Sequence, residues 1–160
     1  KENEKELENN SINSFDDCVL AGNPILESYP RQCKNENQIF TENIGNEIEK
    51  MDLIQIESPR PNQIINSPLN IVGKARGFWF FEASFPIILK DEKGNIISES
   101  FAEAKNDWMT TEFVPFESIL EYKINDELKN KKGLLFLKKD NPSGISDNDD
   151  FLEIPIIFSE

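Results

Sequence analysis

The sequence predicts a mainly β protein: an antiparallel β-sandwich of about seven strands, preceded by a small unit that contains both helix and strand. From residue 51 onward, apolar side chains recur at every second position, which is the spacing of a strand with one buried face. Short segments of Gly, Pro, Asn and Asp separate these stretches. Leu, Ile, Val and Phe together exceed the roughly 20% of residues below which chains tend to stay disordered, so a core can form.

The strongest strand pattern covers residues 79–89, where six alternate positions are apolar. The other expected strands are residues 53–57, 69–75, 96–104, 112–116, 134–139 and 152–158. Proline lacks the N–H group that a strand ladder needs. We therefore expect the strands that carry Pro86 and Pro155 to lie at sheet edges or to bulge at these positions.

The chain before the sandwich is more polar and divides into three parts. Residues 1–13, rich in Glu and Asn, predict a flexible tether, and residues 14–42 predict a small α+β unit. The acidic residues 43–51 predict a linker to the sandwich at 52–160. Within the small unit, Ser14 and Asp17 form a capping pattern that predicts a short helix at 15–21, which Gly22 would end.

Two cysteines, Cys18 and Cys33, are the whole thiol inventory. They either form a disulfide in an exported protein or are two separate buried thiols in the cytosol. The segment between them has few apolar residues with which to hold itself together, which favours a disulfide that would contribute about 3 kcal/mol. The chain begins at Lys1 without Met, so a signal peptide could precede it.

Charge and composition exclude several functions. A net charge of -13 predicts repulsion from nucleic acids and from anionic lipid surfaces, so we expect no nucleic-acid partner. Histidine is absent, which removes the Ser-His and Cys-His nucleophile pairs and the commonest metal ligand. No apolar stretch approaches the roughly 18 residues of a membrane span. We expect no enzymatic activity and no cofactor.

The most unusual stretch holds four consecutive aromatic residues and a glutamate, from Phe78 to Glu82. On a strand, Trp79 and Phe81 would face the core and Phe78 and Phe80 would face outward. Exposed rings could form a platform for a sugar or for a partner protein, unless another segment covers them. Glu82 lies among these rings and could serve at a glycosidic bond, which makes carbohydrate cleavage an alternative.

Other candidate residues lie in two later segments. Trp108 is either a second aromatic platform or a core residue. Asp140, Asn141 and Ser143 form a loop that could extend the contact surface. The acidic run that includes Asp147, Asp149 and Asp150 offers oxygen ligands for calcium, but it lacks the Gly and the distal Glu of an EF-hand loop. An acidic surface loop is the simpler interpretation, so we expect no metal site.

Several stretches between about residues 54 and 158 follow the order of a known family. They are Ile56 to Gln63, Ser67 to Leu69, Ile71 to Gly77, Phe78 to Ala83, Asp91 with Gly94, Asp107 to Met109, Phe113 to Phe116 and Lys139 to Gly144. Together they resemble the Gmad-type immunoglobulin-like domain associated with bacterial spore germination. The resemblance implies an exported or surface-tethered immunoglobulin-like module, without catalytic residues, that binds or spaces other domains.

The small unit is similar to a two-cysteine motif of bacterial envelope lipoproteins. The matching residues are Cys18, Gly22 to Pro24, Tyr29 to Cys33 and Phe40. The similarity implies a lipid-modified cysteine upstream of Lys1 as the sole membrane attachment. A fainter similarity to Kazal-type inhibitors, which use more cysteines, leaves protease inhibition as another alternative. The leading expectation is a non-enzymatic envelope module that binds or scaffolds a protein or a cell-wall glycan, with carbohydrate binding or cleavage as the alternative.

Overall fold

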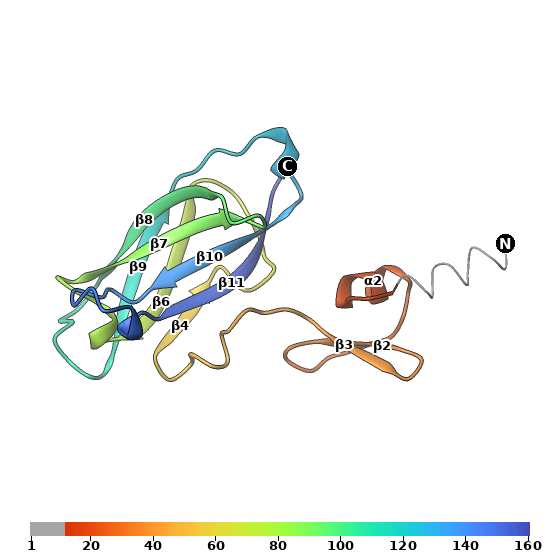
Figure 1. Cartoon of the computed structure of the whole chain (residues 1–160), viewed down its shortest axis with the longest axis horizontal. Helices are drawn as coiled ribbons and strands as arrows, with labels where there is room; N and C mark the ends of the chain where they lie inside the picture. The colour runs from red at the N-terminus through yellow and green to blue at the C-terminus, as the bar shows by residue number, and fades with distance from the viewer. Residues whose placement is uncertain (1–11) are drawn as a thin grey trace. The chain divides into compact units, whose positions relative to one another are not determined.

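The computed structural model describes residues 12–160, which form two compact units. The first unit ends at Ile44 and the second spans Gly45–Glu160 (Figure 1). Most of the expected tether lies outside the described residues. Its penultimate residue, Ile12, is buried in the core of the small unit, so the tether interpretation does not extend that far. None of the helices within residues 12–160 is long and apolar enough to cross a membrane.

The small unit joins one helix to a three-stranded antiparallel sheet. Its elements are α2 (Phe15–Leu20), β1 (Ile25–Leu26), β2 (Gln32–Asn35) and β3 (Gln38–Thr41), and the sheet order is β1-β2-β3. The Ser14 hydroxyl accepts a hydrogen bond from the Asp17 N–H at 3.1 Å and caps the helix. Gly22, with a φ of 83°, follows the end of the helix in the left-handed region. The helix predicted from the capping pattern is therefore confirmed.

A disulfide between Cys18 on α2 and Cys33 on β2 joins the helix to the sheet. Both cysteines are fully buried and pack with Ile12 and Phe15. This cluster is the core of the small unit within the described residues. The alternative of two separate thiols is therefore wrong.

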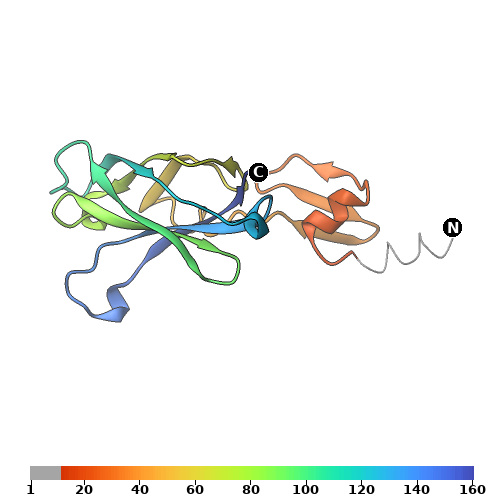
Figure 2. The same cartoon turned by 90° about the horizontal axis from the view of Figure 1, so that it is seen from above.

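The large unit is an eight-stranded sheet that curls into a sandwich (Figure 2). Its strands are β4 (Ile54–Ser58), β5 (Ile64–Ile65), β6 (Leu69–Arg76), β7 (Ser84–Asp91), β8 (Ile96–Ala104), β9 (Phe113–Leu120), β10 (Lys132–Lys138) and β11 (Phe151–Phe158). The order across the sheet is β4-β6-β9-β8-β7-β10-β11-β5. Alternate residues point inward, and the rings of Phe85 on β7 and Phe116 on β9 meet across the core with centroids 4.9 Å apart.

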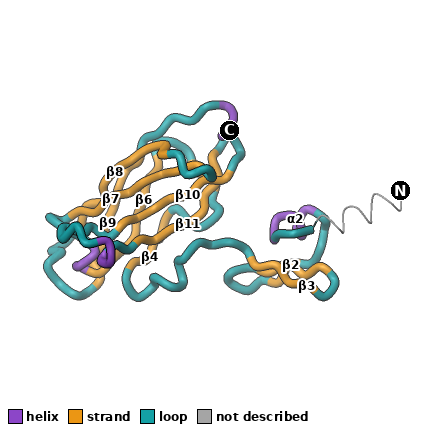
Figure 3. Tube along the Cα trace, in the orientation of Figure 1, coloured by secondary structure: helices purple, strands orange, loops and turns teal. Residues whose placement is uncertain are grey.

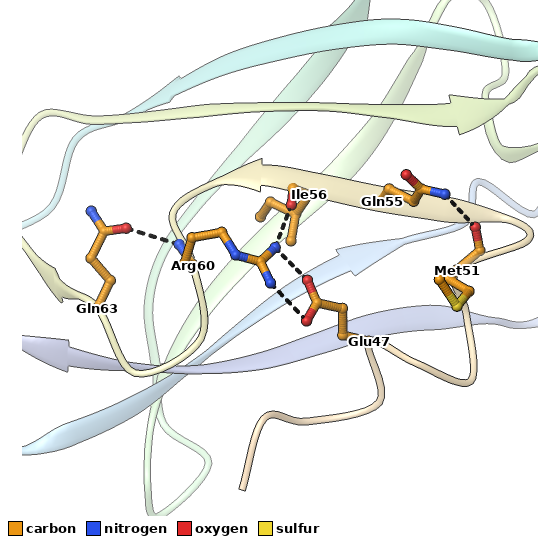
Figure 4. Close-up of polar contacts among 6 residues, drawn as sticks. All are labelled: Glu47, Met51, Gln55, Ile56, Arg60 and Gln63. Atoms are coloured by element: carbon orange, nitrogen blue, oxygen red, sulfur yellow. Dashed lines mark hydrogen bonds and ion pairs between the residues drawn. The ribbon is translucent and has the colours of Figure 1, made fainter. Parts of the chain in front are cut away.

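The first segment of the sandwich contributes to both layers. β4 pairs antiparallel with β6, whereas β5 pairs parallel with β11, so one ladder departs from the expected antiparallel pattern. The register of β4 shifts between Ile56 and Ser58, where the chain begins to cross over. Arg60 stabilises the crossing because its guanidinium donates to the Ile56 carbonyl at 2.7 Å and pairs with both carboxylate oxygens of Glu47 (Figure 4).

Residues that the sequence predicts as a linker contact the sandwich from Gly45 onward. The Asn46 side chain accepts from the Glu153 N–H at 2.7 Å and donates to the Phe151 carbonyl at 3.0 Å. A Cβ atom at Gly45 would lie 1.8 Å from the Glu153 carbonyl oxygen, so only glycine allows this approach. Residues 45–51 therefore belong to the large unit and cover the start of β11.

Both strand prolines lie where the sheet does not require their missing N–H group. β7 is a central strand, contrary to the expected edge, but its ladder to β10 begins only at Ile87, after Pro86. β11 is next to the short strand β5, whose pairing reaches only Ile157 and Phe158. At Pro155, β11 is therefore an edge in practice, as predicted.

The turn between β7 and β8 is organised by the buried carboxylate of Asp91. Its oxygens accept hydrogen bonds of 2.9 Å from the Asn95 side-chain amide and from the backbone N–H groups of Asn95 and Lys93. These hydrogen bonds hold the pKa of Asp91 below its usual value, and the bond from the Asn95 side chain has the largest effect. Burial of the carboxylate acts in the opposite direction and raises the pKa, but by less.

Acid should therefore weaken the large unit partly through Asp91. Because the pKa is lower in the folded than in the unfolded state, the stabilisation is complete above the unfolded pKa of about 3.9 and is lost as the pH falls through the folded pKa. We expect the melting temperature of Asp91→Asn to change less than that of the wild type between about pH 5 and pH 2. Glu92→Gln, at an exposed neighbour, is the control. Identical acid dependence of Asp91→Asn and wild type would contradict this prediction.

Candidate functional site

Three loops meet at the end of the sandwich opposite the C-terminus (Figure 3). They are residues 77–83 between β6 and β7, 105–112 between β8 and β9, and 139–150 between β10 and β11. The backbone N–H of Gly77 donates to the Glu112 carbonyl, and that of Asp140 donates to the Trp79 carbonyl. The strand register therefore places the predicted aromatic stretch, Trp108 and the Asp140 loop together.

The aromatic stretch is not the strand that its alternation predicts. Gly77–Trp79 forms a single 3-10 turn, and β7 begins only at Ser84. Glu82 and Ala83 both have left-handed backbones, with φ of 50° and 66°. Phe81 and Ser84 exchange two backbone hydrogen bonds of 2.9 and 3.1 Å around them. The result is a tight hairpin turn of the kind that usually contains Asn or Gly, which explains why the sequence did not reveal it.

This turn changes which rings are buried. Trp79 and Phe80 are both buried in the core, whereas Phe78 and Phe81 are 46% and 40% exposed. The outward position predicted for Phe80 is therefore wrong, and so is the inward position predicted for Phe81. Trp79 faces the core as predicted, so neither Trp79 nor Phe80 offers an exposed ring for binding. Phe80 instead contacts the Phe85 ring edge to face, with centroids 5.2 Å apart. The physical reason is that successive side chains of a 3-10 turn point about 120° apart, whereas those of a strand point to opposite faces, so the alternation loses its phase at Gly77–Trp79.

Three exposed apolar residues and one half-buried one form a surface that we call the aromatic loop end: Phe78, Phe81, Met109 and the half-buried Trp108. Phe81 and Trp108 contact each other edge to face at 6.5 Å between centroids. Trp108 is half-buried and packs against the core. It is therefore partly a core residue and partly a surface ring, the two interpretations that the sequence left open. Met109 is 75% exposed. Sequence reasoning missed Phe81 and Met109. The position of Met109 in a polar loop beside a tryptophan was the available signal.

Gly77 allows the second loop to approach the first. A Cβ atom at this position would lie 1.9 Å from the Thr110 carbonyl oxygen and 2.2 Å from that of Trp108. Only glycine leaves room for these backbone atoms. Within the second loop, the Asp107 carboxylate accepts from the Met109 N–H at 3.0 Å. These contacts support Trp108 and Met109 at the aromatic loop end.

The third loop is held mainly by its own hydrogen bonds. The Asn141 amide donates to the Ile145 carbonyl at 2.7 Å and to the Asp149 carboxylate at 2.8 Å, and Ser143 donates to Asn141. The predicted contact residues Asn141 and Ser143 thus organise the loop. Lys139, next to Asp140, places its ammonium 5.8 Å from the centre of the Phe78 ring.

The calcium candidates do not converge on one point. Asp149 accepts from Asn141, whereas Asp150 pairs with Lys50 at 2.8 Å. Asp147 lies in the short 3-10 turn Ser146–Asn148. Within residues 12–160, no group of three or more Asp, Glu, Cys or His side chains is arranged to hold a metal ion.

Comparison with known families agrees with this fold. The family described as the immunoglobulin-like domain of bacterial spore germination, Gmad2, matches residues 53–144, which is more than half of the chain. The chain belongs to this family. The match contains the first two loops of the site and ends inside the third. β11 lies beyond the match but completes the Gmad2 domain by pairing with β10 along its whole length.

The immunoglobulin-like fold expected from the resemblance is thereby confirmed. No curated protein and no solved structure matches the chain. The family description assigns the Gmad2 domain to bacterial spore germination and names no ligand. A more specific function is therefore inferred from the aromatic loop end and from the disulfide.

Proposed function

We propose that this protein is a non-enzymatic binding or scaffolding module of the cell envelope, and that its Gmad2 domain binds a partner through the aromatic loop end. The exposure of Phe78, Phe81 and Met109 at the meeting point of three loops carries the proposal. Trp79 and Phe80, buried directly between the exposed rings, fix the first loop to the core. Such a preorganised apolar surface offers contact area at low entropic cost.

The disulfide supports a location outside the cytoplasm, because oxidised cysteine pairs persist in exported proteins. A lipid anchor upstream of Lys1, joined to the small unit by the residues before Ile12, is the proposed mode of attachment to the membrane. It would hold both units at the cell surface. The similarity of the small unit to a lipoprotein motif is the support for this part of the proposal.

A protein partner fits the aromatic loop end better than a glycan does. The rings of Phe81 and Trp108 meet edge to face rather than forming a flat platform on which a sugar could stack. Met109 adds a flexible, polarisable side chain of the kind common at protein-binding surfaces. Carbohydrate binding remains the second candidate because Glu82 is exposed beside Phe81. Protease inhibition by the small unit stays a prediction.

Alanine variants of the aromatic loop end test the proposal. We expect Phe81→Ala and Met109→Ala each to weaken capture of the envelope partner by about tenfold or more, as truncation of a binding hot spot does. Ile96→Ala, at a similarly exposed apolar residue at the opposite end of β8, should bind as the wild type does. Pull-down from an envelope extract, followed by titration of the purified partner, measures the change.

Three results would each contradict part of this proposal. Unchanged partner affinity in both variants would remove the aromatic loop end from the contact. A change in Trp fluorescence with peptidoglycan fragments would instead support the glycan candidate. Release of reducing ends that Glu82→Gln abolishes would establish an enzyme.

A further inference from the structure

A second surface lies where the sheet turns from one layer of the sandwich to the other. Within the described chain, β8 and β9 form ladder pairs only between Glu103 and Glu117 and between Ala104 and Phe116. β8 continues to Ile96 and β9 to Leu120, so the two strands run on past the end of their ladder. We call this region the β8–β9 split.

Serine hydroxyls cross the split in place of a backbone ladder. Ser98 donates to the Glu121 carbonyl at 2.6 Å, Ser100 to the Ile119 carbonyl at 3.2 Å, and Ser118 to the Phe101 carbonyl at 2.9 Å. A hydroxyl that donates one hydrogen bond still has lone pairs that can accept others. The Ser100 and Ser118 hydroxyls also bond to each other at 3.2 Å, and Ser118 is buried. Ser100 is half-buried, so its hydroxyl is the one that offers an acceptor to an N–H group of an incoming polypeptide backbone.

A groove of about 540 Å³ lies over the split. Its lining residues are Asn70, Val72, Ser100, Phe101, Glu103, Glu117, Ser118 and Ile119. Phe101 and Ile119 are 61% and 64% exposed, although both lie on regular strands of the sandwich. They provide apolar area on both sides of the split, and the serine hydroxyls lie between them.

The negative charge of the groove favours a positively charged occupant. Glu103 and Glu117 are direct cross-strand partners, an arrangement in which like charges destabilise a sheet. Lys105 pairs with Glu117 at 3.0 Å, so the pair of glutamates keeps an excess negative charge. The exposed Glu99 and Glu121 add further negative charge along the two strands. A second copy of this chain would bring the same glutamates together, which disfavours self-association here.

We propose that the groove over the β8–β9 split binds an extended, basic segment of a partner protein. An apolar side chain of the segment packs between Phe101 and Ile119, and its lysine or arginine residues pair with Glu103 and Glu117. The backbone of the segment donates a hydrogen bond to the Ser100 hydroxyl. This surface is separate from the aromatic loop end, so the inference does not depend on the proposed function.

A labelled model peptide tests the inference with the whole chain. We expect a fluorescein-labelled peptide of alternating lysine and valine to bind in fluorescence anisotropy, and the matched peptide of alternating glutamate and valine not to bind. The double variant Glu103→Gln, Glu117→Gln should weaken the binding of the basic peptide about tenfold, as expected when two exposed ion pairs are lost. Phe101→Ala should weaken it several-fold through the lost apolar contact.

A charge-matched control separates the groove from the general attraction of an acidic protein. Glu92→Gln, Glu127→Gln removes the same charge at exposed positions away from the groove and should change affinity less than about twofold. Equal losses in the two double variants would overturn the inference, because binding would then follow net charge alone. Absence of binding to the wild type, or full binding by Phe101→Ala, would also overturn it.

Discussion

Replacement of Phe80 by alanine should lower the free energy of unfolding of the large unit by about 3–5 kcal/mol, the usual cost of removing a buried phenylalanine. Phe80 is 3% exposed and contacts Phe85, which in turn contacts Phe116 in the facing layer. The cavity would therefore open where the first loop joins the core. For a unit of this size, we expect the melting temperature to fall by more than about 10 °C.

Phe81→Ala is the matched control, because it removes the same ring from the next residue. Phe81 is partly exposed, and we expect its replacement to change the free energy of unfolding by less than about 1 kcal/mol. Chemical denaturation of both variants, followed by circular dichroism, measures the difference. Equal stability of the two variants would mean that Phe80 does not lie in the core and that the hairpin turn at Glu82 and Ala83 is misplaced.

The second large effect is expected from removal of the Cys18–Cys33 disulfide. A disulfide that closes a loop of this length typically contributes about 2–4 kcal/mol. In the described residues, the core cluster of the small unit adds to the cysteines only Ile12 and Phe15, with Val19 and Phe40 partly buried against them, so little else opposes its unfolding. We expect the double variant Cys18→Ser, Cys33→Ser to unfold within residues 12–44, while the large unit keeps its native structure.

Amide hydrogen exchange followed residue by residue can test this expectation. Protection should be lost in α2, β2 and β3 and retained in the strands of the sandwich. The oxidised wild type, and the wild type treated with reductant, provide the two references. Persistent protection of the small unit after the cysteines are replaced would show that its hydrogen bonds suffice without the bridge.

Local patterns in the sequence were sufficient to predict most strands. Alternation of apolar residues placed β4, β6, β8, β10 and β11 within a few residues of their observed bounds, because a strand with one buried face has a period of two wherever it lies. The capping pair Ser14 and Asp17 located α2 for a similarly local reason, since the cap is a contact between neighbours. The disulfide followed from the scarcity of apolar residues around the cysteines.

The candidate site was predicted only in outline. The sequence alone identified the segment from Phe78 to Glu82 as unusual, but it assigned Phe80 and Phe81 to the wrong sides. Alternation would keep its phase through a strand, whereas the left-handed backbone of Glu82 and Ala83 reverses the chain between the aromatic residues and β7. Residues other than glycine and asparagine rarely adopt this conformation, so their identity gave no warning.

The sequence by itself thus determined the fold class and the positions of most strands, which depend on neighbouring residues, and it favoured the cysteine bridge. Only the tertiary structure decided which rings are exposed, that β5 pairs with β11, and that β8 and β9 separate beyond Glu103 and Glu117. These features depend on contacts between segments far apart in the chain. Whether a given side chain is buried or exposed is decided only when the two layers pack, because close packing determines where each side chain fits.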